Sequence, residues 1–145
     1  GAGQAFSWYI SFEMIPQELL GALNLENASP EYILFVISVA FVIGCMFVDS
    51  IVVLLVLTPV FMPIIDSSGL DPVLVGVVIT LQMAIGSATP PFGCDIFTAI
   101  AVFKKSYMQV ISGIFPFFLI LMLMSAILIF FPDSALFLRN IAFDK

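Results

Sequence analysis

Two short segments hold the residues whose types and spacing could do chemistry. In the first, Asp49 and Ser50 interrupt a long apolar run. In the second, the hydroxyl side chains of Ser87 and Thr89 precede two adjacent prolines, and Asp95 follows four residues after the second proline, in the order Gly86-Ser87-Ala88-Thr89-Pro90-Pro91-Phe92-Gly93-Cys94-Asp95. Carboxylate, hydroxyl and carbonyl oxygens are hard ligands, so both segments favour contact with a cation such as Na⁺ over covalent chemistry.

The second segment cannot continue an undisturbed helix. Pro90 and Pro91 have no backbone N–H, and Pro90 forces Thr89 out of the helical region, so we expect carbonyls from about Gly86 onward to lose their helical partners. Free backbone at membrane depth must face protein, water or an ion. Those carbonyls, with the Ser87 and Thr89 hydroxyls, suit Na⁺, and the positive end of the next half-helix suits an anionic substrate group. The alternative is a proline kink that only shapes packing.

Asp49 is the only charged residue between Glu31 and Asp66. A carboxylate inside a membrane costs about 2.5–3.5 kcal/mol, so it needs a partner. One alternative is that Asp49 caps the helix that follows by accepting from the N–H groups of Val52 or Val53, and the other is direct contact with an ion. The same two alternatives, helix capping or a place at the site, hold for Asp95.

The composition excludes most other chemistry and any soluble fold. The chain is 62% hydrophobic and 10% charged over 145 residues, so its natural solvent is lipid. It has no histidine, and its two cysteines form no metal-spaced cluster. Its net charge of -6 argues against nucleic acid as a partner.

The uncharged runs show which elements must position these segments. Residues 111–131 match the roughly 20 residues of one membrane-spanning helix. Residues 32–65 are too long for one span and too short for two, so cutting them at 44–50 gives two arms of roughly a dozen to fifteen residues, a re-entrant hairpin. Residues 71–103 are long enough to cross once as a helix broken at 86–93, and a second hairpin is also possible by length.

The expected organisation therefore has six parts. These are the end of a truncated transmembrane helix at 1–12, an amphipathic interfacial arm at 13–30, the hairpin at 31–65, the discontinuous helix at 66–103, a transmembrane helix at 104–132 and a tail at 133–145. Because the sequence opens on Gly1 without Met, we expect it to be the C-terminal part of a longer protein.

Four motifs, in order, resemble the large permease (M, DctM-like) subunit of tripartite ATP-independent periplasmic (TRAP) transporters. They are Gly44-Cys45-Met46-Phe47-Val48-Asp49-Ser50, Leu57-Thr58-Pro59-Val60, Gly69-Leu70-Asp71-Pro72 and Gly86-Ser87-Ala88-Thr89-Pro90-Pro91-Phe92-Gly93. The likeness covers nearly the whole chain and matches the C-terminal third of that subunit.

The resemblance implies an all-α membrane protein with an ion-transporter-type fold, in which residues 31–65 and 66–103 are the re-entrant hairpin and discontinuous helix of the second inverted repeat. It implies Na⁺ binding between the hairpin tip and the break, at Gly44, Phe47, Asp49, Ser50, Gly86, Ser87 and Thr89. The substrate-facing set it implies is Ser50, Pro90, Pro91, Gly93 and Asp95. Asp95 departs from the family pattern, where we expect Asn.

The function implied is that of a permease rather than an enzyme, importing an organic acid across the bacterial inner membrane with Na⁺ as coupling ion and no other cofactor. Its expected partners are a periplasmic substrate-binding protein, the small membrane (Q) subunit, the remainder of the M subunit and the lipid bilayer. Three alternatives stay open: a divalent-anion/Na⁺ symporter without a binding protein, an intramembrane aspartyl protease and a membrane anchor without transport. The protease family usually carries Gly-x-Gly-Asp, whereas this chain has Phe92-Gly93-Cys94-Asp95.

Overall fold

The computed structural model describes residues 9, 21, 28–132 and 136, and over that part the chain is built from helices without strands. The helices are α3 (Pro30–Phe47), α4 (Ser50–Ser68), α5 (Pro72–Ser87), α6 (Cys94–Phe103) and α7 (Tyr107–Phe130). This is the all-α class expected from the sequence. The predicted helix end at 1–12, the interfacial arm at 13–30 and the tail at 133–145 lie almost wholly outside the described residues.

Three of these helices are long and apolar enough to cross a membrane: α3 with 18 residues, α4 with 19 and α7 with 24. The arms of the hairpin are therefore longer than the dozen to fifteen residues expected. The difference arises at both ends, because α3 continues helically through Gly44 and Cys45 to Phe47, and α4 continues past Pro63 to Ser68. A small residue such as Gly44 does not end a helix by itself. The turn between the two arms therefore consists of Val48 and Asp49 alone, instead of residues 44–50 as expected.

Local capping fixes where the helices start and stop. Ser29 caps α3, its side chain accepting from the backbone N–H of Tyr32 at 3.4 Å, and Pro30 stands at the first helical position, where its missing N–H costs no hydrogen bond. α4 ends at Gly69, whose φ of 69° is the left-handed conformation that glycine adopts most easily. Asp71 then caps α5 through the N–H of Val73 at 2.8 Å.

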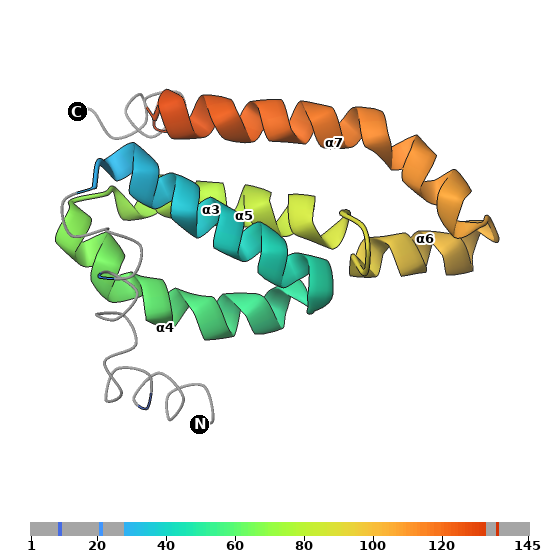
Figure 1. Cartoon of the computed structure of the whole chain (residues 1–145), viewed down its shortest axis with the longest axis horizontal. Helices are drawn as coiled ribbons and strands as arrows, with labels where there is room; N and C mark the ends of the chain where they lie inside the picture. Colours follow the sequence, from blue (N-terminus) through green and yellow to red (C-terminus); the bar gives the residue numbers. More distant parts are fainter. Residues whose placement is uncertain (1–8, 10–20, 22–27, 133–135, 137–145) are drawn as a thin grey trace, which may run out of the picture.

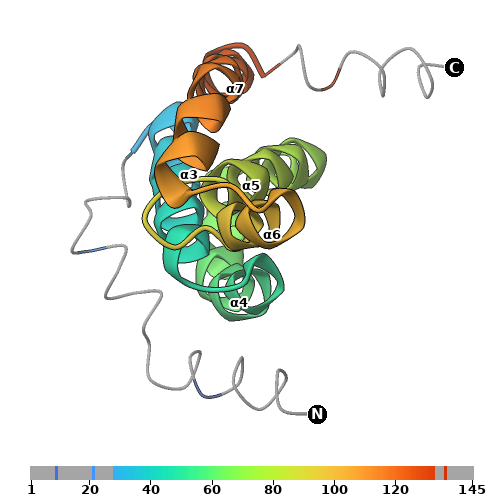
Figure 2. The same ribbon diagram turned by 90° about the vertical axis from the view of Figure 1, so that its right-hand side faces the viewer.

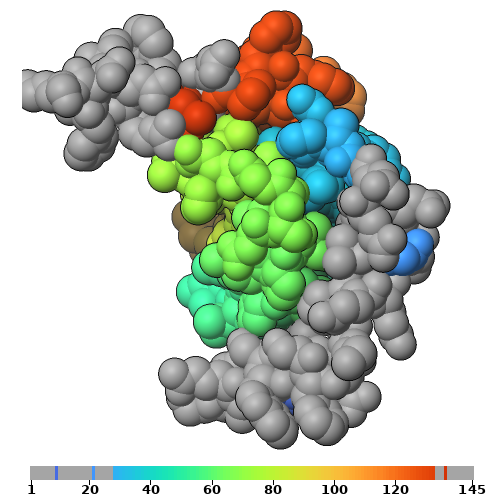
Figure 3. All heavy atoms as spheres, turned by 90° about the vertical axis from the view of Figure 1, so that its left-hand side faces the viewer, coloured from blue at the N-terminus to red at the C-terminus, as the bar shows by residue number. Residues whose placement is uncertain are grey.

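The helices form an elongated assembly (Figure 1). α3 and α4 run antiparallel, and α6 continues beyond α5 in the same general direction, which Figure 2 shows end-on with α6 in front of α5. α7 runs back along them. Figure 3 looks onto the end where α4 passes into α5, with the start of α3 and the end of α7 beside it. The α6–α7 connection, with Lys104 and Lys105, lies at the opposite end (Figure 1).

The core lies between α3 and α5. Ile33, Ile37, Phe41 and Cys45 are spaced four apart, so they form one stripe on α3, and all are buried. α4 closes one side, where the Phe41 and Phe61 rings pack with centroids 6.4 Å apart. The buried residues of the other helices in this core include Val53, Ile64, Ile65, Leu74, Val75, Val78, Ile79 and Ile129. α7 buries little of its surface, so most of its apolar side chains face outward.

Candidate functional site

The turn between α3 and α4 is organised by Asp49. Its Oδ1 accepts from the N–H of Ile51 at 2.9 Å, and its carbonyl accepts from Val53 at 3.0 Å. The capping interpretation is confirmed, with Ile51 as the side chain's partner in place of Val52 or Val53. Because the cap uses one carboxylate oxygen and Asp49 is exposed, the second oxygen stays accessible to a cation.

Gly44 holds the two arms of the hairpin together. A Cβ placed on Gly44 would lie 2.8 Å from Cγ1 of Val53, so a larger residue would require the Val53 side chain to shift, and glycine accommodates the close approach of α3 and α4. Gly44 is thus placed for helix packing. Its carbonyl accepts from the N–H of Val48 at 3.0 Å, which closes the end of α3.

The hairpin turn lies against the break between α5 and α6. A Cβ on Gly86 would lie 2.5 Å from Cβ of Cys45 and 2.7 Å from the carbonyl oxygen of Val42, so α5 touches the backbone of α3 there. The Phe47 and Phe92 rings, one at the end of α3 and one in the break, have centroids 5.9 Å apart. Buried Cys45 also lies beside Ser50. The structure therefore brings together the two segments that the sequence singled out.

Within the break, the prolines free fewer carbonyls than expected. In a continuous helix the residues at positions 90 and 91 would donate to the carbonyls of Gly86 and Ser87, and prolines have no N–H to do so. The Gly86 carbonyl accepts instead from Thr89 at 3.0 Å, and the Thr89 carbonyl accepts from Gly93 at 3.2 Å. Within the described part of the chain, the Ser87 carbonyl loses its helical donor to a proline and accepts from no other backbone N–H.

The two hydroxyls of the break bond back to α5. The Thr89 hydroxyl donates to the carbonyl of Ile85, one turn earlier. The Ser87 hydroxyl lies 3.1 Å from the Ala84 carbonyl and 2.6 Å from Oδ2 of Asp95. Each hydroxyl carries one donor and two acceptor lone pairs, so both retain acceptor capacity toward a cation.

Of the two alternatives for Asp95, the one in which it caps α6 is wrong. The N-cap of α6 is Gly93, with no side-chain hydrogen bond, and the Asp95 carboxylate instead reaches back across the break to Ser87. Asp95 lies in the first turn of α6, where its side chain faces Ser87 at the end of α5. It therefore links the two half-helices.

Gly93 gives the break its tight geometry. Gly93 is buried, and a Cβ there would collide with the Ser87 carbonyl and lie 2.8 Å from the Thr89 carbonyl oxygen. Pro90 is partly buried and Pro91 exposed. The Pro91 carbonyl accepts from the Tyr107 hydroxyl at 2.9 Å, which ties the loop to the start of α7. Sequence reasoning missed Tyr107, because no local pattern connects it with a loop sixteen residues earlier.

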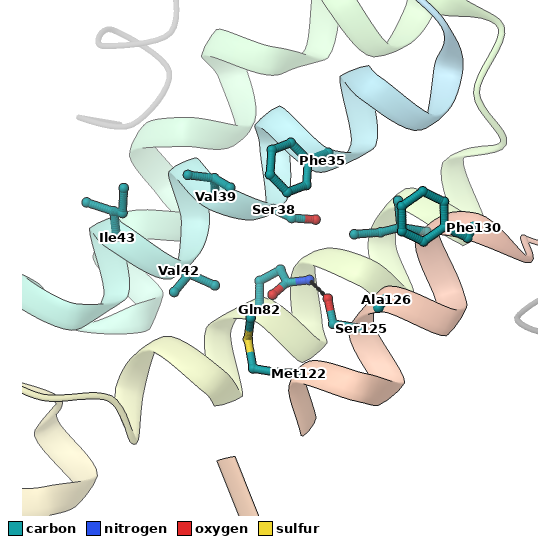
Figure 4. Close-up of a pocket in the computed structure, with 11 residues that line it drawn as sticks. Phe35, Ser38, Val39, Val42, Ile43, Gln82, Met122, Ser125, Ala126 and Phe130 are labelled. Atoms are coloured by element: carbon teal, nitrogen blue, oxygen red, sulfur yellow. Dashed lines mark hydrogen bonds between the residues drawn. The ribbon is translucent and has the colours of Figure 1, made fainter. Parts of the chain in front are cut away.

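A second polar group that sequence reasoning missed lies in the middle of the assembly. Gln82 is 2% exposed, and its Nε2 donates to the Ser125 hydroxyl at 2.6 Å, linking α5 to α7. Ser38 on α3 faces the same cleft of about 230 Å³, and its buried hydroxyl has no hydrogen-bond partner among the described residues (Figure 4). The signal is present in the sequence, since a lone amide in the apolar run 72–94 requires a partner.

Comparison with known proteins gives the chain its family. The family model described as "Tripartite ATP-independent periplasmic transporter, DctM component" matches residues 1–134. The large permease protein of the ectoine/5-hydroxyectoine TRAP transporter of Ruegeria pomeroyi is 66% identical over 145 residues, covering 100% of this chain and 34% of its own length. The large permease protein of the ectoine TRAP transporter of Halomonas elongata is 62% identical over 141 residues, covering 97% of this chain and 33% of its own length.

A more distant relative is the large permease protein of the C4-dicarboxylate TRAP transporter of Pseudomonas aeruginosa, 30% identical over 135 residues, with 93% of this chain and 32% of its own length covered. The chain thus spans about a third of the length of the curated relatives it matches. No solved structure matches it.

Proposed function

The chain belongs to the DctM component family of tripartite ATP-independent periplasmic transporters, and on that premise we propose that it forms the Na⁺-binding half-site and one wall of the substrate path in a large permease subunit. The observation that carries the proposal is the contact between the hairpin turn and the helix break, where Gly86 lies against Val42 and Cys45 and Phe92 packs on Phe47. Membership of a permease family also counts against the intramembrane protease, which would need enzyme chemistry.

The ligands proposed for Na⁺ are oxygens from both sides of this contact. The second carboxylate oxygen of Asp49 and the Ser50 hydroxyl come from the turn, and the Ser87 carbonyl and the Thr89 hydroxyl come from the break. Phe47 and Gly86 are proposed to shape the site through packing. Binding an ion to both segments favours the conformation in which they touch, and the ion shifts the equilibrium only by its differential affinity for that conformation.

We propose that residues 31–65 are re-entrant because of the depth that their turn reaches, although α3 and α4 are each long and apolar enough to cross a membrane. From the helical rise per residue, α3 is about 27 Å long and α7 about 36 Å. α3 starts and α7 finishes at the same end of the molecule (Figure 1). From that end, the turn after α3 extends only as far as the break between α5 and α6. α6, about 15 Å long, extends beyond it. If α7 measures the membrane thickness, the hairpin turns back inside the membrane, as in the second inverted repeat of an ion-transporter-type fold.

The proposed cargo is a small organic acid of the ectoine kind, because the two relatives above 60% identity are named for ectoine. The proposed assembly comprises the remainder of the large subunit, the small membrane subunit and a periplasmic substrate-binding protein, in the bacterial inner membrane. Selectivity is then shared between the binding protein and the permease.

Uptake by the complete transporter in proteoliposomes tests this function. Radiolabelled ectoine should accumulate when an inward Na⁺ gradient and the cognate binding protein are both present. Replacing Na⁺ with K⁺, or omitting the binding protein, should abolish accumulation. Na⁺-driven uptake without any binding protein would favour the rival divalent-anion-type symporter, and uptake indifferent to the gradient would refute Na⁺ coupling.

A further inference from the structure

Asp95 places a negative charge at the helix break that nothing in the described part of the chain balances. Its polar contacts are the Ser87 hydroxyl at 2.6 Å and the Cys94 thiol at 4.0 Å, and neither is positively charged. Lys104 and Lys105 lie at the far end of α6, roughly 14 Å along its axis. An exposed carboxylate in an apolar segment is costly to leave unpaired, so this charge calls for a positively charged partner.

The geometry of the carboxylate is suited to a donor from outside the chain. Ser87, itself buried, holds Oδ2 and so restricts the side chain's rotation. Oδ1 has only the thiol at 4.0 Å, which is too long for a normal hydrogen bond. One oxygen is fixed and the other is available.

We propose that Asp95, positioned by Ser87, is a specificity-determining residue that binds the cationic half of a zwitterionic substrate. The inference rests on the proposed function. The positive end of α6 alone would suit a purely anionic substrate, but the Asp95 charge opposes one. Ectoine is a cyclic amidine that carries a carboxylate. The two N–H donors of its amidinium point away from each other, so one of them can donate to the available Oδ1 in a charge-assisted hydrogen bond. The substrate class selected is a small ring bearing both charges.

This role differs from that of a Na⁺ ligand in what it discriminates. A Na⁺ ligand affects every substrate equally, because the ion is common to all of them. A group that contacts the amidinium affects only substrates that have one. The ratio of two affinities measured at the same Na⁺ concentration therefore separates the two roles.

Equilibrium binding to the purified membrane complex, large and small subunits together and without the binding protein, tests the proposal. The two probes are ectoine and 5-oxoproline, a ring carboxylate of similar size whose ring nitrogen is a neutral amide. Asp95→Asn should weaken ectoine binding by about tenfold or more, the loss expected for one charge-assisted hydrogen bond, and leave 5-oxoproline binding unchanged or tighter. Asp95→Glu should retain a preference for ectoine. The control is Asp66→Asn, an exposed carboxylate at the other end of the molecule, which should change neither affinity.

Equal weakening of both probes in Asp95→Asn, or an unchanged ectoine affinity, would overturn the proposal. If Asp95→Asn does not purify as a monodisperse complex, Ser87→Ala carries the test, since it frees the carboxylate without removing its charge and should lower the ectoine to 5-oxoproline preference in the same direction. If the transporter takes up a carboxylate in response to the Na⁺ gradient, but the ratio of ectoine to 5-oxoproline affinity is unchanged in Asp95→Asn, the proposed function is supported and only this inference is refuted.

Discussion

Replacing Gly86 with Ala tests whether the contact between the hairpin and the break is as close as the structure shows. The new Cβ would lie 2.5 Å from Cβ of Cys45 and 2.7 Å from the Val42 carbonyl oxygen. Both atoms are fixed to the backbone of α3, so no side-chain rotation relieves the overlap. Ordinary contacts between such atoms start near 3.4 Å. α3 and α5 must therefore move apart by close to an ångström.

The expected cost follows from the same geometry. Overpacking a well-packed interior costs about 1–3 kcal/mol. Ala gains about 0.5–1 kcal/mol over Gly in a helix interior through backbone entropy, which offsets part of that cost. A net destabilisation of about 0–2.5 kcal/mol remains, and the overlap with two backbone-fixed atoms places it toward the upper end.

Gly76→Ala is the matched control, because Gly76 lies in the same helix, is exposed and has open space within 4 Å of the position that a Cβ would take. The assay is thermal unfolding of the purified membrane complex. Gly86→Ala should lower the melting temperature by several degrees and raise the Na⁺ concentration for half-maximal uptake, whereas Gly76→Ala should leave both unchanged or raise the melting temperature slightly. Equal melting temperatures for the two variants would show that α3 and α5 are not in contact at Gly86.

Three further variants probe the neighbouring contacts. Asp49→Asn should keep the cap on α4 and raise the Na⁺ concentration for half-maximal uptake. Asp49→Ala should raise that concentration as well and also lose about 0.5–2 kcal/mol of stability, because the cap is lost. If the Na⁺ dependence of uptake in both variants matches that of the unchanged protein, Asp49 is not a Na⁺ ligand. Tyr107→Phe should speed amide hydrogen exchange at residues 92–94 by releasing the Pro91 carbonyl, and unchanged exchange would show that the 2.9 Å bond does not hold the loop. Ser125→Ala should destabilise the complex by about 1–3 kcal/mol, because it leaves the buried Gln82 amide unpaired. The double variant Gln82→Met/Ser125→Ala should recover part of that loss. If the losses of stability from the two substitutions add, the Gln82–Ser125 hydrogen bond does not stabilise the complex.

Features set by neighbouring residues could be predicted from the sequence, and features set by distant ones could not. The Asp49 cap and the interruption around Pro90 and Pro91 depend on groups a few residues apart, and the structure has them close to the predicted positions. The hairpin arms are longer than predicted because Gly44, which suggests an interruption in the sequence, lies inside α3 and lets α4 approach.

The contacts of Asp95 and Tyr107 depend on the path of the chain around the break. The first turn of a helix suggests a cap, but the fold brings Ser87 to the Asp95 carboxylate and Gly93 takes the N-cap position. Tyr107 reaches Pro91 because α7 starts beside the loop that precedes α6. The turn and the break lie against each other at Gly86 and at the Phe47–Phe92 pair, and the roles of their residues toward Na⁺ and substrate stay predictions.

The sharpest test of a Na⁺ site at the break is the Na⁺ dependence of the proposed ectoine uptake in Thr89→Ala, compared with Thr80→Ala. Both threonines bond back to a carbonyl one turn earlier, Thr89 to Ile85 and Thr80 to Gly76, but only Thr89 lies in the break. We expect Thr89→Ala to raise the Na⁺ concentration for half-maximal uptake several-fold and Thr80→Ala to leave it unchanged. Superimposable Na⁺ curves for the two variants would contradict a Na⁺ site at the break.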